Sequence, residues 1–196
     1  MRLKQTPSQT VGPFFAYGLT PEQYGYAFRS LAGPVLVDDD TPGERIRIVG
    51  RVLDGHGNPV PDAMLEIWQA DGEGRYGHPA DQRGSNLRFE GFGRCGTGAD
   101  PASRFAFETI KPGPIGDGQA PHVNVILFMR GMLSHVFTRV YFDDEAEANA
   151  RDPVLAGVEE GRRRTLIAQR TTAPGGTVYR FDLRMQGPDE TVFFDG

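Results

Sequence analysis

Glycine and proline interrupt this chain at short intervals, and that punctuation limits the folds the chain can adopt. The 196 residues include 26 glycines and 15 prolines, which fall between short apolar stretches. Both residue types end regular elements and fill turns, so the pattern favours short strands joined by turns. A β-rich chain of this length readily forms one core, and we expect a single main domain.

Hydrophobic alternation predicts where the strands lie. Residues 45–49 and 104–108 alternate between polar and apolar side chains, as half-buried strands do. Residues 123–129 are almost all apolar, which indicates a strand buried on both faces. Further strands are predicted at residues 63–68, 137–142, 178–185 and 191–194, and helices at residues 145–149 and 163–168. The predicted fold is all-β: a β-sandwich of mostly antiparallel strands over residues 35–196, with a short helical excursion around residues 145–170.

Residues 1–34 form an arm with a different character. Prolines at positions 7, 13 and 21 exclude a long helix or an internal strand. The arm carries several aromatic residues without a clear period: Phe14, Phe15, Tyr17, Tyr24, Tyr26 and Phe28. Such an arm cannot bury its rings on itself, so it packs either on its own domain or on a partner, where the rings would anchor a subunit interface.

Composition argues against several classes of protein. The net charge is −5, and no basic block is long enough to indicate nucleic-acid binding. No apolar run approaches the ~20 residues that span a bilayer, and the first residues lack the apolar core of a secretory signal. Cys95 is the only cysteine, so no internal disulfide can form. We expect a soluble, cytoplasmic protein.

One strand carries part of a metal-binding pattern. A His-x-His pair on a strand places both imidazoles on one face, where they can clamp one metal ion. Here His122 is followed two residues later by Asn124, and a neutral amide is a poor ligand for a transition metal. His122 alone is expected to be a buried side chain with a hydrogen bond. Trp68, an aromatic residue on a predicted strand, is expected in the core.

Five stretches in order resemble the intradiol ring-cleavage dioxygenases, and within that family the chains that carry no iron. They are Gln-Thr-Pro-Ser-Gln-Thr-Val-Gly-Pro-Phe from residue 5, Leu-Glu-Ile-Trp-Gln-Ala-Asp from residue 65, Phe-Glu-Thr-Ile-Lys-Pro-Gly-Pro from residue 107, Thr-Arg-Val-Tyr-Phe-Asp-Asp from residue 138, and Tyr-Arg-Phe-Asp-Leu-Arg-Met-Gln-Gly from residue 179. The resemblance covers nearly the whole chain. It implies a β-sandwich, in agreement with the strand pattern.

The resemblance also implies that this chain has lost a metal site. Catalytic members of the family hold ferric iron with two tyrosines and a His-x-His pair. Those four positions fall here on Arg83, Ile115, His122 and Asn124. A guanidinium and an alkyl side chain offer iron no donor atom. The arginine and glutamine that flank the iron are also replaced, by Gln119 and Arg139. We therefore expect no metal in this chain and Fe(III) in a partner β subunit.

A role without metal follows from the same resemblance. The chain would form αβ pairs in a larger oligomer, with O₂ and 3,4-dihydroxybenzoate (protocatechuate) as substrates. Thr10, Gly12 and Pro13 would approach the partner's substrate pocket, where a glycine allows close contact and a proline stiffens the backbone. Arg130 follows an apolar run and would bind or steer the substrate carboxylate. The plainer alternatives are an ordinary turn at Gly12 and a surface ion pair at Arg130.

Two other functions stay open at the level of sequence. In the first, His122 joins other donors, such as Tyr76, Tyr141 or Tyr179, in an independent metalloenzyme. In the second, the chain is a stand-alone β-sandwich module that binds a small aromatic molecule or a protein partner.

Overall fold

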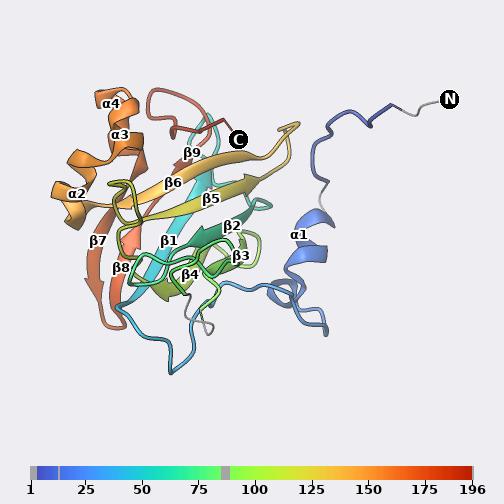
Figure 1. Ribbon diagram of the computed structural model, residues 1–196. Coiled ribbons are helices and arrows are strands. Elements are labelled where there is room, and N and C mark those ends of the chain that lie inside the picture. The colour runs from blue at the N-terminus through green and yellow to red at the C-terminus, as the bar shows by residue number, and fades with distance from the viewer. Residues whose placement is uncertain (1–3, 13, 85–88, 196) are drawn as a thin grey trace.

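The computed structural model describes residues 4–12, 14–84 and 89–195, and its strands form two packed layers (Figure 1). The layers share one continuous path of hydrogen-bonded strands, in the order β3-β2-β5-β6-β7-β8-β1-β4, with β9 beside β1. The bounds are β1 Arg45–Leu53, β2 Met64–Gln69, β3 Phe92–Gly96, β4 Arg104–Ile110, β5 His122–Phe128, β6 Val136–Phe142, β7 Ile167–Ala173, β8 Gly176–Arg180 and β9 Leu183–Arg184. Most pairs are antiparallel, and the predicted β-sandwich is confirmed.

Alternating burial explains why these segments are strands. In β4, Phe105 and Phe107 point into the core while Arg104 and Glu108 face outward. The same alternation along β1, β2 and β5 fills the space between the layers with aliphatic and aromatic side chains. Burial of this apolar surface is the main force that holds the layers together. The prediction that β5 is buried on both faces is wrong, because Asn124, Ile126 and Phe128 on its other face are only half-buried.

The helical excursion lies between β6 and β7, at one end of the sandwich (Figure 1). It contains the helices α2 Ala146–Arg151, α3 Pro153–Gly157 and α4 Glu160–Arg163 and the 3₁₀ turns η2 Asp143–Glu145 and η3 Arg164–Leu166. Asp152 caps α3 by accepting hydrogen bonds from the backbone of Val154 and Leu155. The predicted helix over residues 163–168 is wrong in its second half, because β7 begins at Ile167 and pairs with β6.

Other strand boundaries also differ from the sequence prediction. β3 and β7 were not predicted, since neither shows a regular apolar alternation. The single strand predicted over residues 178–185 is broken between β8 and β9, where the Asp182 carboxylate accepts a hydrogen bond from the Arg51 backbone at 2.9 Å. The strand predicted at residues 191–194 is only an isolated bridge from Phe194 to Phe137.

The arm packs partly on its own domain. It contains helix α1 Phe14–Leu19 and the 3₁₀ turn η1 Pro21–Tyr24. The Gln23 side chain accepts a hydrogen bond from the Gly96 backbone of β3 at 2.7 Å. Gly33 accepts one from Arg94 of β3, and Leu36 donates one to Glu108 of β4. Residues 20–36 therefore cover two strand edges that would otherwise expose unpaired backbone groups.

The first described residues, 4–12, behave differently from the rest of the arm. They form no helix or strand and are almost all exposed. In Figure 1 this segment runs away from the sandwich on the side of α1. Among the helices of the described residues, none is long and apolar enough to cross a bilayer.

Candidate functional site

Strand β5 begins at His122, one of the four positions at which the sequence predicts that a metal site has been lost. His122 is buried, and its Nδ1 lies 2.8 Å from the carbonyl oxygen of Ala120. That contact requires a hydrogen on Nδ1, so Nε2 carries the lone pair; among the described residues it has no hydrogen-bond partner. The pKa of His122 is lowered to about 4, mainly by burial and also by the charge of Arg139, whereas the Ala120 carbonyl acts in the opposite direction. The expected buried, hydrogen-bonded histidine is confirmed.

Asn124 is held by neighbours on the same outer face of β5. Its amide donates to the hydroxyl of Tyr76 at 3.2 Å and to the carbonyl of Trp68 at 3.3 Å. Burial raises the pKa of Tyr76, although the hydrogen bond from Asn124 and the charges of Arg139 and Arg83 oppose that shift. Asn124 is thus held in place through its amide nitrogen, and a neutral amide is in any case a poor ligand for a transition metal.

The prediction that Trp68 lies in the core is wrong, because its side chain is 40% exposed. The neighbours Ile67 and Gln69 are buried, so the alternation of β2 turns Trp68 outward. Its ring packs against that of Tyr76 at a centroid distance of 4.8 Å. Both rings line an open cavity of about 560 Å³ together with His78, Asp81 and Arg83.

Arg83, at the position of one lost tyrosine, is tied to its own loop. Its Nε lies 2.8 Å from Oδ1 of Asp81 and its Nη2 lies 2.6 Å from Oδ2, a two-point ion pair. The hydrogen bonds from Arg83 hold the pKa of the Asp81 carboxyl well below its usual range. Arg83 Nη2 also donates to the carbonyl of Gly74 at 2.8 Å. The guanidinium therefore ties residues 74, 81 and 83 of this loop together.

Gln119 and Arg139 form a direct pair. Arg139 Nη1 donates to Gln119 Oε1 at 2.8 Å and approaches the hydroxyl of Tyr141 at 3.3 Å. Tyr141 in turn donates to the buried carboxylate of Asp152. Burial is the main reason why the pKa of Tyr141 rises to about 12. An arginine on strand β6 and a glutamine on the loop before β5 thus meet beside Tyr141.

Lys111 anchors the loop that carries Ile115 and Gln119. Its Nζ forms ion pairs with Asp144 at 2.9 Å and Glu145 at 2.6 Å, and it is only 13% exposed. The hydroxyl of Tyr179 donates to the same Asp144 carboxylate. The Lys-Pro-Gly-Pro segment is therefore fixed at its start to η2 and β8, although Ile115 itself contributes no donor atom.

These residues do not fit a ferric ion. The four family positions supply one imidazole, an amide, a guanidinium and an alkyl chain, and only the imidazole is a good ligand. Within the described part of the chain, no group of three histidine, cysteine, aspartate or glutamate residues is arranged to hold a metal. The three tyrosines of the alternative metalloenzyme are all engaged in other contacts. The hydroxyls of Tyr141 and Tyr179 donate to the carboxylates of Asp152 and Asp144. The hydroxyl of Tyr76 accepts a hydrogen bond from Asn124.

A second group of predicted residues meets at the turn after β5. The backbone N–H of Gly131 donates to the hydroxyl of Thr10 at 3.0 Å, so the arm touches this turn. Next to it, Arg130 Nε forms an ion pair with Asp62. Gly12 is exposed, with open space around the position of a Cβ, and Pro13 lies outside the described residues. No sequence pattern singled out Asp62, which lies in the turn before β2.

Comparison with known proteins shows that this chain is similar to dioxygenases. The family model described as "Dioxygenase" matches residues 21–187. The chain is 59% identical over 194 residues to the protocatechuate 3,4-dioxygenase alpha chain of Burkholderia cepacia, covering 98% of each chain. It is 39% identical over 161 residues to the beta chain from the same organism, covering 76% of this chain and 67% of that one.

A solved structure supports the fold independently. The dioxygenase domain of a dioxygenase–carbohydrate-binding protein fusion from Streptomyces sp. SirexAA-E superposes with a TM-score of 0.58, covering 95% of this chain and 100% of that chain. At 23% identity this likeness concerns the fold alone.

Proposed function

This chain belongs to the intradiol ring-cleavage dioxygenase family, and we propose that it is the iron-free α chain of a protocatechuate 3,4-dioxygenase. In this proposal a homologous β chain holds Fe(III), and the two chains pair in a larger oligomer. The assembled enzyme uses O₂ to cleave 3,4-dihydroxybenzoate between its hydroxyl-bearing carbons, giving 3-carboxy-cis,cis-muconate. The iron supplies the activation of substrate and O₂ in the partner.

Two observations together support this proposal: the chain is closely similar in sequence to a known alpha chain, and it lacks most of the iron-ligand side chains of the family. Identity of 59% over almost the full length supports a shared role with the alpha chain. Yet only His122, of the four family ligand positions, keeps a metal-binding side chain, and Asn124 and Arg83 are committed to other contacts. A chain that keeps the fold of the family without the donors fits a role as pocket wall and interface.

The residues of this chain would then act by binding and positioning. Thr10, Gly12 and Pro13 form the part of the arm that would reach the partner's pocket, and Arg130 would face the substrate carboxylate. A guanidinium is suited to that anion because it offers several donors and keeps its charge. The buried thiol of Cys95 is compatible with a reducing, cytoplasmic setting.

Co-expression with the β chain of the same source tests this proposal. We expect the two chains to copurify as αβ pairs that consume O₂ and protocatechuate, whereas this chain purified alone should be inactive and colourless. Removing residues 1–12 should weaken copurification if the arm is part of the interface. A stable lone monomer in the presence of the β chain would contradict the proposal.

A further inference from the structure

Strand register brings Asp62 and Arg130 together at one corner of the sandwich. Strands β2 and β5 are antiparallel, with Met64 opposite Phe128. Continuing that register by two residues places Asp62, before β2, opposite Arg130, after β5, on the same face. The Asp62 carboxylate forms an ion pair with Nε of Arg130, and the side chain of Asp62 is 21% exposed against 58% for Arg130.

The ion pair with Asp62 leaves the two terminal nitrogens of Arg130, Nη1 and Nη2, without a contact to Asp62. A guanidinium has five N–H donors, and the ion pair with Asp62 lies at Nε, without a hydrogen bond to Oδ2 of Asp62 among the described residues. In the part of the chain that the structure describes, no hydrogen bond from Nη1 or Nη2 of Arg130 is found. Those two nitrogens form the flat fork that binds a carboxylate at two points.

The neighbouring residue is also fixed. Gly131 has a φ of +90°, a left-handed conformation that turns the chain directly after Arg130. Its N–H donates to the hydroxyl of Thr10 at 3.0 Å. Asp62 thus holds the side chain of Arg130, while Thr10 holds the backbone that follows it.

We propose that Asp62 is a positioning residue of the ring-cleavage enzyme, holding Nε of Arg130 so that the free fork meets the carboxylate of the substrate in the partner's pocket. The inference rests on the proposed function. Without Asp62, the long arginine side chain regains several rotamers, and each binding event must order it again.

Positioning and simple electrostatics predict opposite effects for the loss of this carboxylate. If Asp62 were only a nearby negative charge, its removal would make the corner more positive and strengthen the attraction of an anionic substrate. If Asp62 orients Arg130, its removal weakens binding of that same substrate. The direction of the change in KM therefore separates the two.

The experiment uses the co-expressed αβ enzyme and compares protocatechuate with catechol, which lacks the carboxylate and serves as alternative substrate or competitive inhibitor. We expect Asp62→Asn to raise KM for protocatechuate about fivefold, with kcat within about twofold and the KM or inhibition constant of catechol unchanged. Arg130→Ala should have a similar or larger effect, and the double variant should match Arg130→Ala alone, because both changes remove one interaction.

Two further variants keep the test decisive. Arg130→Lys retains the charge but has no second set of donors for a fork, so it should also raise KM for protocatechuate. Asp189→Asn removes a comparable aspartate–arginine pair with Arg164, elsewhere on the surface, and should leave the kinetics unchanged.

The outcomes separate this inference from the proposed function. An unchanged or lowered KM in Asp62→Asn, while Arg130→Ala raises KM, would overturn the positioning role and leave the proposed function intact. Effects of the two substitutions that add would also overturn it. An inactive mixture of the unaltered chains would overturn the proposed function itself.

Discussion

His122 has the orientation that a metal-binding histidine would need. Its Nδ1 is fixed by the Ala120 carbonyl, and among the described residues Nε2 has no hydrogen-bond partner. A metal-binding histidine is oriented in the same way, by a hydrogen bond to its other ring nitrogen. Its neighbours do not supply further ligands, because Asn124 and Arg139 are paired across β5 and β6.

Burial of His122 makes stability depend on pH. Its pKa is lowered from 6.5 to about 4, so the folded chain keeps the ring neutral while the unfolded chain protonates it below pH 6.5. The stabilisation from the neutral ring is complete above pH 6.5 and is lost as the pH falls toward 4. We expect this residue to lower the free energy of unfolding by about 2 kcal/mol between pH 7 and pH 5.

Urea unfolding of the chain at both pH values, compared with His122→Gln, measures that difference. The variant should lose about 2 kcal/mol less than the parent chain over this interval. His56→Gln, in an exposed turn, serves as the control. Equal pH dependence in the parent chain and His122→Gln would show that the ring is not held neutral.

The sequence predicted the surroundings of some site residues and not of others. The burial of His122 could be predicted, because it precedes an apolar strand and stands in a known pattern. The exposure of Trp68 could not, because it depends on which face of β2 meets the other layer. Asp62 was missed because its position beside Arg130 results from the register of two strands that are far apart in sequence.

Among the elements, strands with alternating or continuous apolar side chains were predicted. β1 and β4 show the alternation that burial between the layers produces, and β5 and β6 were predicted from runs of mostly apolar residues. β7 is mostly exposed and is a strand because β6 and β8 pair with it. Because β7 is a strand through its pairing with neighbouring strands, its local sequence pattern does not predict it.

Strand β1 offers a sharp test of packing between elements. A Cβ placed on Gly50 would lie 1.7 Å from the carbonyl oxygen of Phe181 and 2.8 Å from the ring of Phe105. Gly50→Ala must therefore push β1 away from the segment that joins β8 to β9. We expect the free energy of unfolding to fall by about 3 kcal/mol or more, measured by urea denaturation.

Gly161→Ala is the matched control for this substitution. Gly161 lies in α4 with open space around a Cβ, so alanine should be neutral or stabilise the helix by up to ~1 kcal/mol. A loss below about 1 kcal/mol for Gly50→Ala would mean that β1 and Phe181 are not as closely packed as described.

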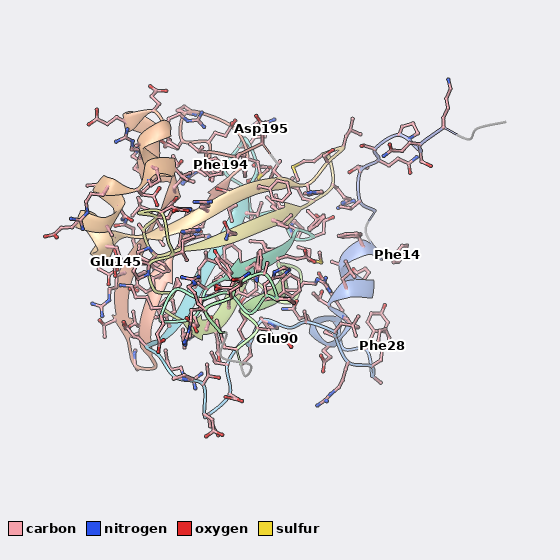
Figure 2. The ribbon with its side chains drawn as sticks, viewed as in Figure 1. Phe14, Phe28, Glu90, Glu145, Phe194 and Asp195 are labelled. Carbon is pink, nitrogen blue, oxygen red and sulfur yellow. The ribbon has the colours of Figure 1, made fainter. Side chains whose placement is uncertain are left out.

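At the scale of the whole molecule, three of the large exposed aromatic residues lie on the arm: Phe14, Tyr26 and Phe28. Phe14 is 78% exposed and Phe28 57%, and Figure 2 shows both on the side of the arm away from the sheets. Packing on its own domain, one of the two destinations that the composition left open, is confirmed for part of the arm. Residues 20–36 cover strand edges of their own domain, whereas residues 4–12 and the outer aromatic rings remain available for a subunit interface.

The iron content of the purified αβ enzyme tests most directly whether this chain has given up its metal. Metal analysis together with protein quantification gives the number of ferric ions per αβ pair. We predict one ion per pair, with none in this chain when it is purified alone. Two ions per pair, or a stoichiometric ferric ion in the isolated chain, would contradict an iron-free role.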